Sequence, residues 1–398
     1  MLDLLPTQAP DALLAVMAAY AADPSAEKVD LGVGVYKDAV GATPVMAAVK
    51  AAEARLIAAQ TSKVYVGPGG NRPFAGFIER LTLGADHPAL KDGRVATLQT
   101  PGGCGALRLI ADLVIRAGGT GQILIGEPTW ANHHPLLTSA GLSAQRMPYF
   151  DVRRQALRFD EMIGAMNLAP SGTVVLLQGA CHNPTGADLD RAQWAEVTEV
   201  LQRRGLVPLV DQAYQGLGNG LDEDAEGIRM LAAALPEVLV SVSCSKNFGL
   251  YRERVGAVVV VAQSAAGAST SLTHLQMLAR RMYSMPPDHG AAIVATLASD
   301  PALLQAWQAE LTTMRDRVNG LRRMLADALA AEYGDDRHEA IARQRGMFSL
   351  LGSLSPEAVA RLAREEHVYT APDGRINLAG LPERAVGRVA AALRRVAP

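Results

Sequence analysis

Seven short β-rich runs alternate with helical segments in the middle of the chain, and no other feature of the sequence constrains the fold as strongly. Several runs are continuously apolar, such as "TVVLLQGA" and "RVGAVVVVA", as expected for strands covered on both faces. This alternation predicts an α/β fold with a mostly parallel, doubly wound, seven-stranded sheet flanked by helices. The expected strands cover residues 95–100, 122–128, 144–150, 173–180, 206–214, 238–245 and 254–262.

From about residue 265, long helical stretches replace the alternation and lead into a short α+β tail. Ser355 followed by Pro356 is typical of a helix start, with the serine as the cap and the proline in the first helical position. We therefore expect a large sheet domain and a second, smaller α+β domain that the N-terminal residues join. The expected division is an N-terminal arm at 1–10, a small domain at 11–43 and 314–398, and a large domain at 44–313.

Charge and cysteine content argue against several classes of protein. The net charge of −2 gives no basic surface for nucleic acid, and the longest apolar strand-like run, "GAVVVVA", is too short to span a bilayer. The apolar N-terminal stretch contains Asp3 and Pro6 and has no basic flank, unlike a signal peptide. Three widely spaced cysteines without a CxxC pair argue against disulfides and a zinc site. We expect a soluble cytoplasmic protein with no metal, nucleic-acid partner or membrane partner.

Lysine is rare in this chain, which makes Lys246 conspicuous. Only six of the 38 basic residues are lysines, and Lys246 is the only one after Lys91. One explanation is a compositional bias toward arginine, with one lysine surviving by chance. The other is chemical, because a lysine amine changes its pKa readily and can form a Schiff base, whereas arginine keeps its proton.

Polar residues occur at the carboxyl ends of the expected strands, where open α/β sheets bind ligands. The first strand leads into "TPGGCGALR", which is either an anion site at a helix start or a plain strand-to-helix turn. It lacks the third glycine of a dinucleotide fingerprint, and the chain has no Walker A lysine. The other polar residues at this edge are Asn183, Asp211, Tyr214, Ser243, Ser245, Lys246 and Arg254.

Together these residues supply an amine, a carboxylate, an amide, a phenol, an arginine and a phosphate cradle at one edge of one sheet. Each has an ordinary structural explanation by itself; Asp211, for example, could cap a helix or form a structural ion pair. The combination, however, is what pyridoxal phosphate requires for its aldehyde, ring nitrogen, phenolic oxygen and phosphate. The set therefore favours pyridoxal phosphate as the cofactor.

Over essentially its whole length the sequence resembles the aspartate and aromatic aminotransferases, which are class I, fold-type I pyridoxal phosphate enzymes. The motifs that carry the resemblance are "DLGVGVYKD", "TPGGCGALR", "CHNPTG", "VDQAYQG", "SKNFGLYRERVG", "GMFSLLG" and "GRINLAG". The resemblance implies the fold-type I architecture with a smaller α+β domain. It also implies transfer of amino groups between amino acids and 2-oxo acids by a ping-pong mechanism.

The resemblance further implies roles for individual residues around the cofactor. Lys246 would form the Schiff base and carry the proton between substrate and cofactor, and Asp211, backed by His133, would keep the ring nitrogen protonated. Trp130 would stack on the ring. The phenolic oxygen would be bound by Asn183 and Tyr214. The phosphate would be bound by Gly103, Cys104, Ser243, Ser245, Arg254 and the partner subunit's Tyr65, which joins Lys246 and Asp211 as a catalytic residue.

Cys104 departs from the family pattern, since this position is usually threonine or serine. A thiol is a weaker hydrogen-bond donor than a hydroxyl. We expect the backbone amide contact to remain and the affinity for the cofactor to fall slightly.

Substrate binding, by the same resemblance, depends on two arginines. Arg375 would bind the α-carboxylate with two parallel hydrogen bonds, a geometry that lysine does not reproduce. Arg280, supplied by the other subunit, would bind a side-chain carboxylate. A site built from both subunits implies an obligate homodimer. The remaining expected contacts of the substrate are Gly34, Trp130, Asn183 and Phe348.

The substrate preference depends on what surrounds Arg280. Aspartate-preferring relatives commonly have asparagine where this chain has Val64 and Met285, and apolar side chains there would let Arg280 swing out and admit an aromatic ring. Neutral drift explains the same residues. We expect an aminotransferase for phenylalanine, tyrosine and tryptophan that retains activity on aspartate and uses 2-oxoglutarate as acceptor. The alternatives are an aspartate-preferring aminotransferase and, more remotely, a decarboxylase or lyase of the same fold.

Overall fold

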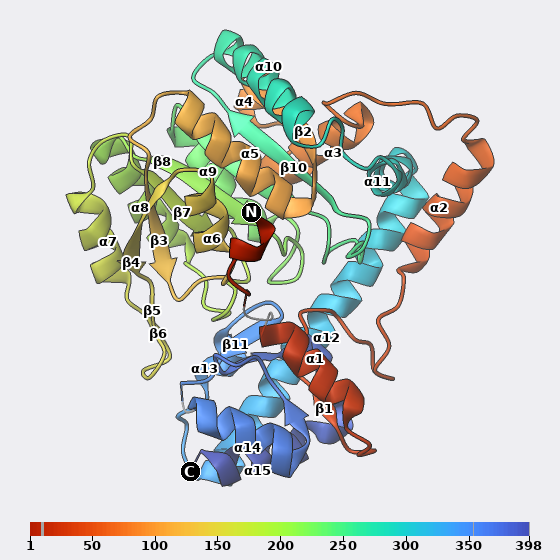
Figure 1. Cartoon of the computed structure of the whole chain (residues 1–398), viewed down its shortest axis with the longest axis vertical. Coiled ribbons are helices and arrows are strands. Elements are labelled where there is room, and N and C mark those ends of the chain that lie inside the picture. The colour runs from red at the N-terminus through yellow and green to blue at the C-terminus, as the bar shows by residue number, and fades with distance from the viewer. Residues whose placement is uncertain (9–11, 353, 398) are drawn as a thin grey trace.

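The computed structural model describes residues 1–8, 12–352 and 354–397, and one seven-stranded sheet forms its centre (Figure 1). The strand order is β2-β10-β9-β8-β7-β3-β4, and only β10 runs antiparallel to its neighbours. This confirms the predicted mostly parallel sheet. Its strands are β2 (Val95–Pro101), β3 (Gln122–Glu127), β4 (Ser143–Pro148), β7 (Val174–Gln178), β8 (Val207–Gln212), β9 (Val238–Ser243) and β10 (Val255–Val261).

Both faces of the sheet are buried at strands β7 to β10, which is why these strands are apolar at successive positions, whereas the edge strand β4 is mostly exposed. On β7, Val175 and Leu177 belong to one hydrophobic core and Val174 and Leu176 to the other. The second core is covered by α5 (Gly102–Arg116), α6 (His133–Ser139) and α10 (Ala265–Met282). The first core is covered by α2 (Ala47–Ala59), α3 (Arg72–Leu83), α4 (Pro88–Lys91), α7 (Phe159–Leu168), α8 (Arg191–Arg204), α9 (Glu226–Ala234) and α11 (His289–Ser299).

Helix α1 (Ala12–Ala22), strand β1 (Val29–Asp30) and the C-terminal residues pack together below the sheet (Figure 1). Here β1 pairs in parallel with β12 (Val368–Tyr369), and β11 (Phe348–Leu350) pairs antiparallel with β13 (Arg375–Asn377). Ser355 caps the helix that follows it by accepting a bond of 3.1 Å from the Ala358 amide, as predicted. The helices of this part are α1 (Ala12–Ala22), α13 (Ala340–Arg343), α14 (Pro356–Glu366) and α15 (Val386–Val396).

Shorter elements complete the chain. The strands β5 (Phe150–Asp151) and β6 (Ala156–Leu157) form a hairpin. The 3₁₀ turns are η1 (Leu2–Leu4), η2 (Glu223–Ala225), η3 (Leu378–Gly380) and η4 (Glu383–Ala385).

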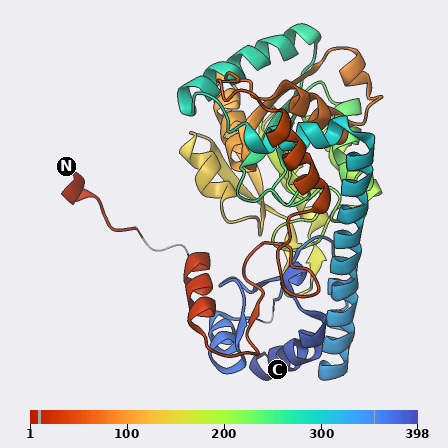
Figure 2. The same cartoon turned by 90° about the vertical axis from the view of Figure 1, so that its right-hand side faces the viewer.

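One long helix, α12 (Pro301–Tyr333), runs from the sheet to the C-terminal part along one side of the molecule (Figure 2). Asp300 caps its start by accepting bonds from the Ala302 and Leu303 amides, and Gly334, at a φ of 74°, ends it. The expected domain boundary at 313/314 lies inside this uninterrupted helix. The two parts therefore share a structural element, and their division at that point stays a prediction.

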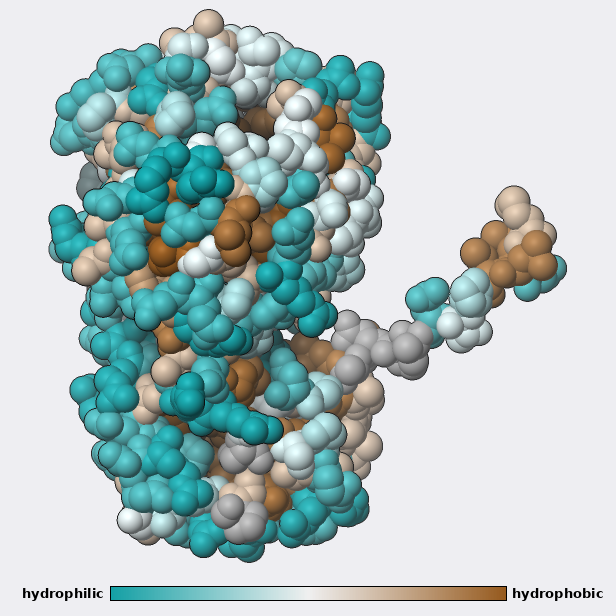
Figure 3. Space-filling view, turned by 90° about the vertical axis from the view of Figure 1, so that its left-hand side faces the viewer, coloured by the Kyte–Doolittle hydropathy of each residue, from teal (hydrophilic) through white to brown (hydrophobic). Residues whose placement is uncertain are grey.

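Residues 1–8 project away from the rest of the molecule (Figure 2), and the tip of this segment is apolar (Figure 3). Leu2, Leu4 and Leu5 are each more than two-thirds exposed. Residues 9 and 10 of the predicted arm lie outside the described residues. Within the part of the chain that the structure describes, no helix is both long and apolar enough to cross a membrane.

Candidate active site

A cavity of about 270 Å³ lies at the carboxyl ends of β7, β8 and β9, the edge at which a ligand site was expected. Leu13, Leu107, Gln178 and Ala213 line it without having been predicted. The predicted residues in its wall are Gly34, Gly103, Cys104, Trp130, Asn183, Asp211, Tyr214, Ser243, Ser245, Lys246, Arg254, Phe348 and Arg375. The structure thus brings together side chains from nearly the whole length of the chain.

One end of the cavity is suited to an anion. Helix α5 begins at Gly102, and the amides of its first turn have no acceptors within the helix. Arg254 lies directly over this turn: a Cβ atom on Gly102, whose φ is +69°, would lie 2.5 Å from a guanidinium nitrogen of Arg254. Arg254 also donates a bond of 3.3 Å to the Ser245 hydroxyl. Amides, a hydroxyl and a fixed positive charge therefore converge at this point.

The carboxylate of Asp211 is buried at the end of β8 and paired with His133. The His133 Nε2 atom lies 3.1 Å from Asp211 Oδ2, and His133 Nδ1 lies 2.7 Å from the Thr129 hydroxyl. Trp130 packs edge-on against the His133 ring at a centroid distance of 5.2 Å. A buried carboxylate at the end of so apolar a strand needs such a partner, because burying it unpaired costs too much free energy.

Lys246 is partly buried and lines the cavity. Its Nζ atom lies 5.2 Å from the centre of the Tyr214 ring. Burial lowers the pKa of the Lys246 amine below its ordinary value, and the charge of nearby Asp211 opposes that shift. A lowered pKa makes the amine better able to take up and release a proton near neutral pH.

The turn that carries Lys246 is held from behind by α12. The Trp307 indole donates a bond of 2.8 Å to the carbonyl of Asn247, the residue after Lys246. Trp307 also stacks on Phe248 with the ring planes 3° apart and the centroids 4.5 Å apart. The position of Lys246 is therefore fixed by a residue 61 positions further along the chain.

Asn183, Tyr214 and Arg375 form a hydrogen-bonded group in the cavity wall. The Asn183 amide donates to the Tyr214 hydroxyl at 3.3 Å and accepts from Arg375 at 3.2 Å. Arg375 also donates to the Gly32 carbonyl at 3.2 Å, while its Nε atom is buried without a hydrogen-bond partner. Burial raises the pKa of Tyr214, so its phenol stays protonated and available as a donor. Arg375 retains an unused donor that a carboxylate could satisfy.

Phe348 closes this wall. The Arg375 guanidinium carbon lies 4.3 Å from the centre of the Phe348 ring, and the Tyr214 ring meets Phe348 edge-on. The backbone at Gly34 approaches so closely that a Cβ atom there would lie 2.9 Å from the tip of the Phe348 ring. Only glycine allows this approach without a shift of the ring.

The sequence matches the aminotransferase class I and II family over residues 26–393, which is most of the chain. The chain belongs to this family. It is accordingly a pyridoxal phosphate-dependent aminotransferase, and the predicted enzyme class and cofactor are confirmed.

Individual relatives agree with this assignment. The tyrosine aminotransferase of Rhizobium meliloti is 49% identical over 98% of both chains. The aspartate aminotransferase of Haemophilus influenzae is 43% identical over 94% of both chains. The crystal structure of an aromatic-amino-acid aminotransferase from Burkholderia pseudomallei, covalently bound to pyridoxal phosphate, matches this aminotransferase with a TM-score of 0.97 at 39% identity and covers 100% of both chains.

The residues in the cavity of the aminotransferase fit pyridoxal phosphate. The anion end has the donors that a phosphate needs, and the bare backbone at Gly102 leaves room beside Arg254. A buried carboxylate, a lysine amine and an amide–phenol pair lie in the same cavity, as the ring nitrogen, aldehyde and phenolic oxygen require. The donor set therefore matches the cofactor group by group.

Tyr65 and Arg280 of the aminotransferase lie outside the cavity of their own chain. Tyr65 is 86% exposed, and Arg280, also exposed, donates a bond of 2.7 Å to the Ser284 hydroxyl. Val64 is 78% exposed, and Met285 is partly buried. This placement accords with the expectation that Tyr65 and Arg280 act on a partner subunit, and their roles stay predictions.

Gln178 is the most informative of the residues that were missed. Its side chain accepts a bond of 2.8 Å from the backbone N–H of Asn183 and donates one of 2.9 Å to the backbone carbonyl of Asn183. It therefore fixes the backbone of the residue that contacts both Tyr214 and Arg375. Its position as a polar residue at the end of the apolar run "VVLLQ" was the available signal. Leu13 and Leu107 carried no such signal, because apolar residues in helices resemble ordinary core.

Proposed function

We propose that this aminotransferase takes amino groups from phenylalanine, tyrosine, tryptophan and aspartate and transfers them to 2-oxoglutarate. The composition of the cavity wall carries the proposal. Apart from Arg254 at the anion end, Arg375 is the one arginine among the described residues that line the cavity. An aromatic side chain gains from apolar surroundings, whereas a second carboxylate finds no further arginine among the described residues of the cavity wall. The large apolar residues of the wall are Leu13, Leu107, Trp130 and Phe348.

Sequence similarity supports the same preference. The identity to the Rhizobium meliloti tyrosine aminotransferase is 49%, against 43% for the Haemophilus influenzae aspartate aminotransferase. Val64 and Met285 supply apolar side chains where amides would help to fix Arg280.

The residues of the cavity divide the work of the reaction. Bound pyridoxal phosphate supplies the aldehyde that takes up the amino group and the ring that withdraws electrons from the substrate. Lys246 Nζ takes the proton from the substrate Cα and returns it on the cofactor side, since its lowered pKa suits both steps. The Asp211 carboxylate, oriented by His133 at its Oδ2 atom, would keep the ring nitrogen of the bound cofactor protonated.

The remaining residues bind and orient. Arg375 holds the α-carboxylate, which amino acids and 2-oxo acids share, and one site therefore serves both half-reactions of a ping-pong mechanism. Asn183 and Tyr214 would donate to the phenolic oxygen of the bound cofactor, and Trp130 would stack on its ring. The phosphate would be held by Gly103, Cys104, Ser243, Ser245 and Arg254.

A homodimer is part of the proposal. The apolar tip of residues 1–8 is exposed (Figure 3), and large exposed apolar groups mark surfaces that another chain covers. Tyr65 and Arg280, also exposed, would complete the site of the partner subunit. A cytoplasmic location accords with the three free thiols of Cys104, Cys181 and Cys244.

The half-reaction with single amino acids tests the substrate preference. Phenylalanine and aspartate, each mixed separately with the purified holoenzyme, should both bleach the absorption band of the lysine-bound cofactor. At equal concentration the bleaching should be faster with phenylalanine. Bleaching by aspartate alone would place the enzyme among the aspartate-preferring aminotransferases and make Val64 and Met285 neutral changes.

The role of Arg280 predicts a selective loss. In Arg280→Leu, kcat/KM for aspartate should fall about 10–100-fold, because a hydrogen bond to a charged group contributes roughly 1.5–3 kcal/mol. The value for phenylalanine should change less than about threefold, because its ring needs no charged partner. Arg281→Leu, a change at the neighbouring exposed arginine, is the matched control. A larger aspartate defect in Arg281→Leu than in Arg280→Leu would show that Arg281, and not Arg280, binds the side-chain carboxylate.

Cys104 predicts a gain in cofactor affinity on substitution. Cys104→Thr should lower the dissociation constant for pyridoxal phosphate about three- to tenfold, because one ordinary hydrogen bond contributes roughly 0.5–1.5 kcal/mol. Titration of the apoenzyme, followed by tryptophan fluorescence, measures the constant. Cys104→Ala, which removes the thiol without adding a hydroxyl, is the control and should not tighten binding. An unchanged constant in Cys104→Thr would mean that this side chain does not contact the phosphate.

A further inference from the structure

Arg322 lies on α12 and is completely buried, yet the hydrogen bonds that it donates among the described residues all go to neutral oxygen atoms. Burial lowers the pKa of its guanidinium to about 10, which leaves the group charged at neutral pH. Its hydrogen-bond acceptors all belong to residues 341–349, and the nearby charge of Asp188 favours the protonated guanidinium without a direct ion pair. These acceptors are the carbonyls of Ile341, Arg345, Gly346 and Phe348 and the hydroxyl of Ser349.

The first set of contacts leads to Phe348. Arg322 donates a bond of 2.6 Å to the Phe348 carbonyl and one of 2.8 Å to the Ser349 hydroxyl, and both residues are in β11. This strand pairs with β13, whose first residue is Arg375. The Phe348 ring also lies against the Arg375 guanidinium. Arg322 therefore fixes both the ring that Arg375 packs on and the strand beside it.

The second set leads to Asn183. The Arg345 amide donates a bond of 2.8 Å to the Gly186 carbonyl, and Arg322 in turn binds the Arg345 carbonyl. A Cβ atom on Gly186 would lie only 3.0 Å from Arg322 and 2.5 Å from the Phe348 carbonyl. The loop that begins at Asn183 therefore packs against Arg322. The side-chain oxygen of Asn183 accepts the hydrogen bond from Arg375.

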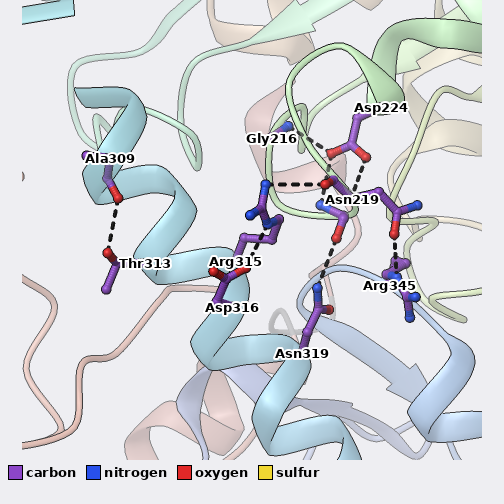
Figure 4. A network of polar contacts seen from close by, with 10 residues as sticks. Gly216, Asn219, Asp224, Ala309, Thr313, Arg315, Asp316, Asn319 and Arg345 are labelled. Carbon is purple, nitrogen blue, oxygen red and sulfur yellow. Dashed lines mark hydrogen bonds and ion pairs between the residues drawn. The ribbon is translucent and has the colours of Figure 1, made fainter. Parts of the chain in front are cut away.

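Another side chain of α12 contacts the loop of residues 216–219, which follows Tyr214 in the chain (Figure 4). Asn319 donates a bond of 3.0 Å to the Gly218 carbonyl, and the Arg345 side chain donates one of 2.7 Å to Asn219. The buried carboxylate of Asp224 closes this loop by accepting the amides of Gly216, Gly218 and Asn219. Arg345 thus links the two regions, since its backbone binds Arg322 and its side chain binds this loop.

We infer that Arg322 is a positioning residue for Arg375 and acts through Phe348 and the Asn183 loop. The inference rests on the proposed role of Arg375 in binding the α-carboxylate. A guanidinium can reach several carbonyls at once because its donors form a rigid planar fork, and a lysine ammonium cannot. Arg322→Lys keeps the charge but loses some of these contacts, which loosens Arg375 without changing any group that touches the substrate.

The experiment compares KM, kcat and ligand binding in Arg322→Lys holoenzyme. KM should rise about tenfold for the amino acid and for 2-oxoglutarate, because both carry the α-carboxylate, while kcat changes less than about twofold. The dissociation constant of 3-phenylpropionate, a carboxylate without an amine, should rise by a similar factor in calorimetric titration. Ser349→Ala removes a single contact of Arg322 and should give a smaller rise in KM and in the dissociation constant. It provides the test if Arg322→Lys does not fold.

Tyr333→Phe is the matched control. It removes a hydrogen bond of 2.6 Å from α12 to the Ala397 carbonyl, far from the cavity, and should lower the melting temperature with both KM values unchanged. Unchanged KM and 3-phenylpropionate binding in folded Arg322→Lys and Ser349→Ala would overturn the inference and leave Arg322 a purely structural residue. The KM ratios can be measured with aspartate as well as phenylalanine. A failure of the proposed aromatic preference would therefore be seen in the wild-type enzyme and would not affect this test.

Discussion

Turnover should fall at least about 10⁴-fold in a Lys246→Arg variant, while the fold and noncovalent cofactor binding persist. Arginine has no primary amine for the cofactor aldehyde, and its guanidinium does not give up a proton near neutral pH. Two functions, covalent attachment and proton transfer, would be lost together. The rate of phenylalanine-dependent glutamate formation measures the first result. Circular dichroism and cofactor titration measure the second.

The control for this variant is Lys91→Arg, the same change at a surface lysine. The Lys91 side chain forms an exposed ion pair with Asp86, and arginine can form the same pair. Full activity is expected there. Near-normal turnover in Lys246→Arg would contradict the entire assignment of the cavity, since no other lysine lines it among the described residues.

The second large effect is expected at Asp211. Asp211→Asn keeps the shape of the side chain but removes the negative charge that holds the proton on the ring nitrogen. Removing one such fixed electrostatic partner costs about 10²–10³ in kcat. The measurement is single-turnover bleaching by phenylalanine, which isolates the chemical step from product release.

His133→Gln separates the charge of Asp211 from its orientation. Because His133 bonds to only one oxygen of Asp211, its loss should reduce kcat about tenfold or less, the scale of one hydrogen bond. Equal defects in the two variants would mean that the orientation of the carboxylate, rather than its charge, limits the reaction.

Much of the sheet and of its polar edge could be predicted from the sequence because both depend on local patterns. Continuous apolar runs marked the strands, and Asn183 and Asp211 stood out because polar residues rarely end such runs without a reason. Lys246 stood out because lysine is otherwise absent from the last three-quarters of the chain.

The supports of the site could not be predicted in the same way. Trp307 and Arg322 occupy α12 at positions that local periodicity assigns to ordinary core, yet each binds backbone carbonyls of a distant segment. Such contacts depend on how α12 crosses the sheet, and a helical pattern does not contain that information. Leu13 and Leu107 were missed for a related reason, since an apolar side chain shows its role only when the cavity it faces is known.

The uninterrupted course of α12 has a consequence for how the molecule comes apart. The first hydrophobic core is continuous from the sheet into the C-terminal part, and α12 contributes buried residues along most of its length, from Leu303 to Leu329. If the C-terminal part unfolded alone, the C-terminal half of α12 would lose its packing partners. Apolar surface that continues into the N-terminal half of α12 would then be exposed to water. The two parts therefore constitute one cooperative unit, which should denature in a single transition rather than in two steps.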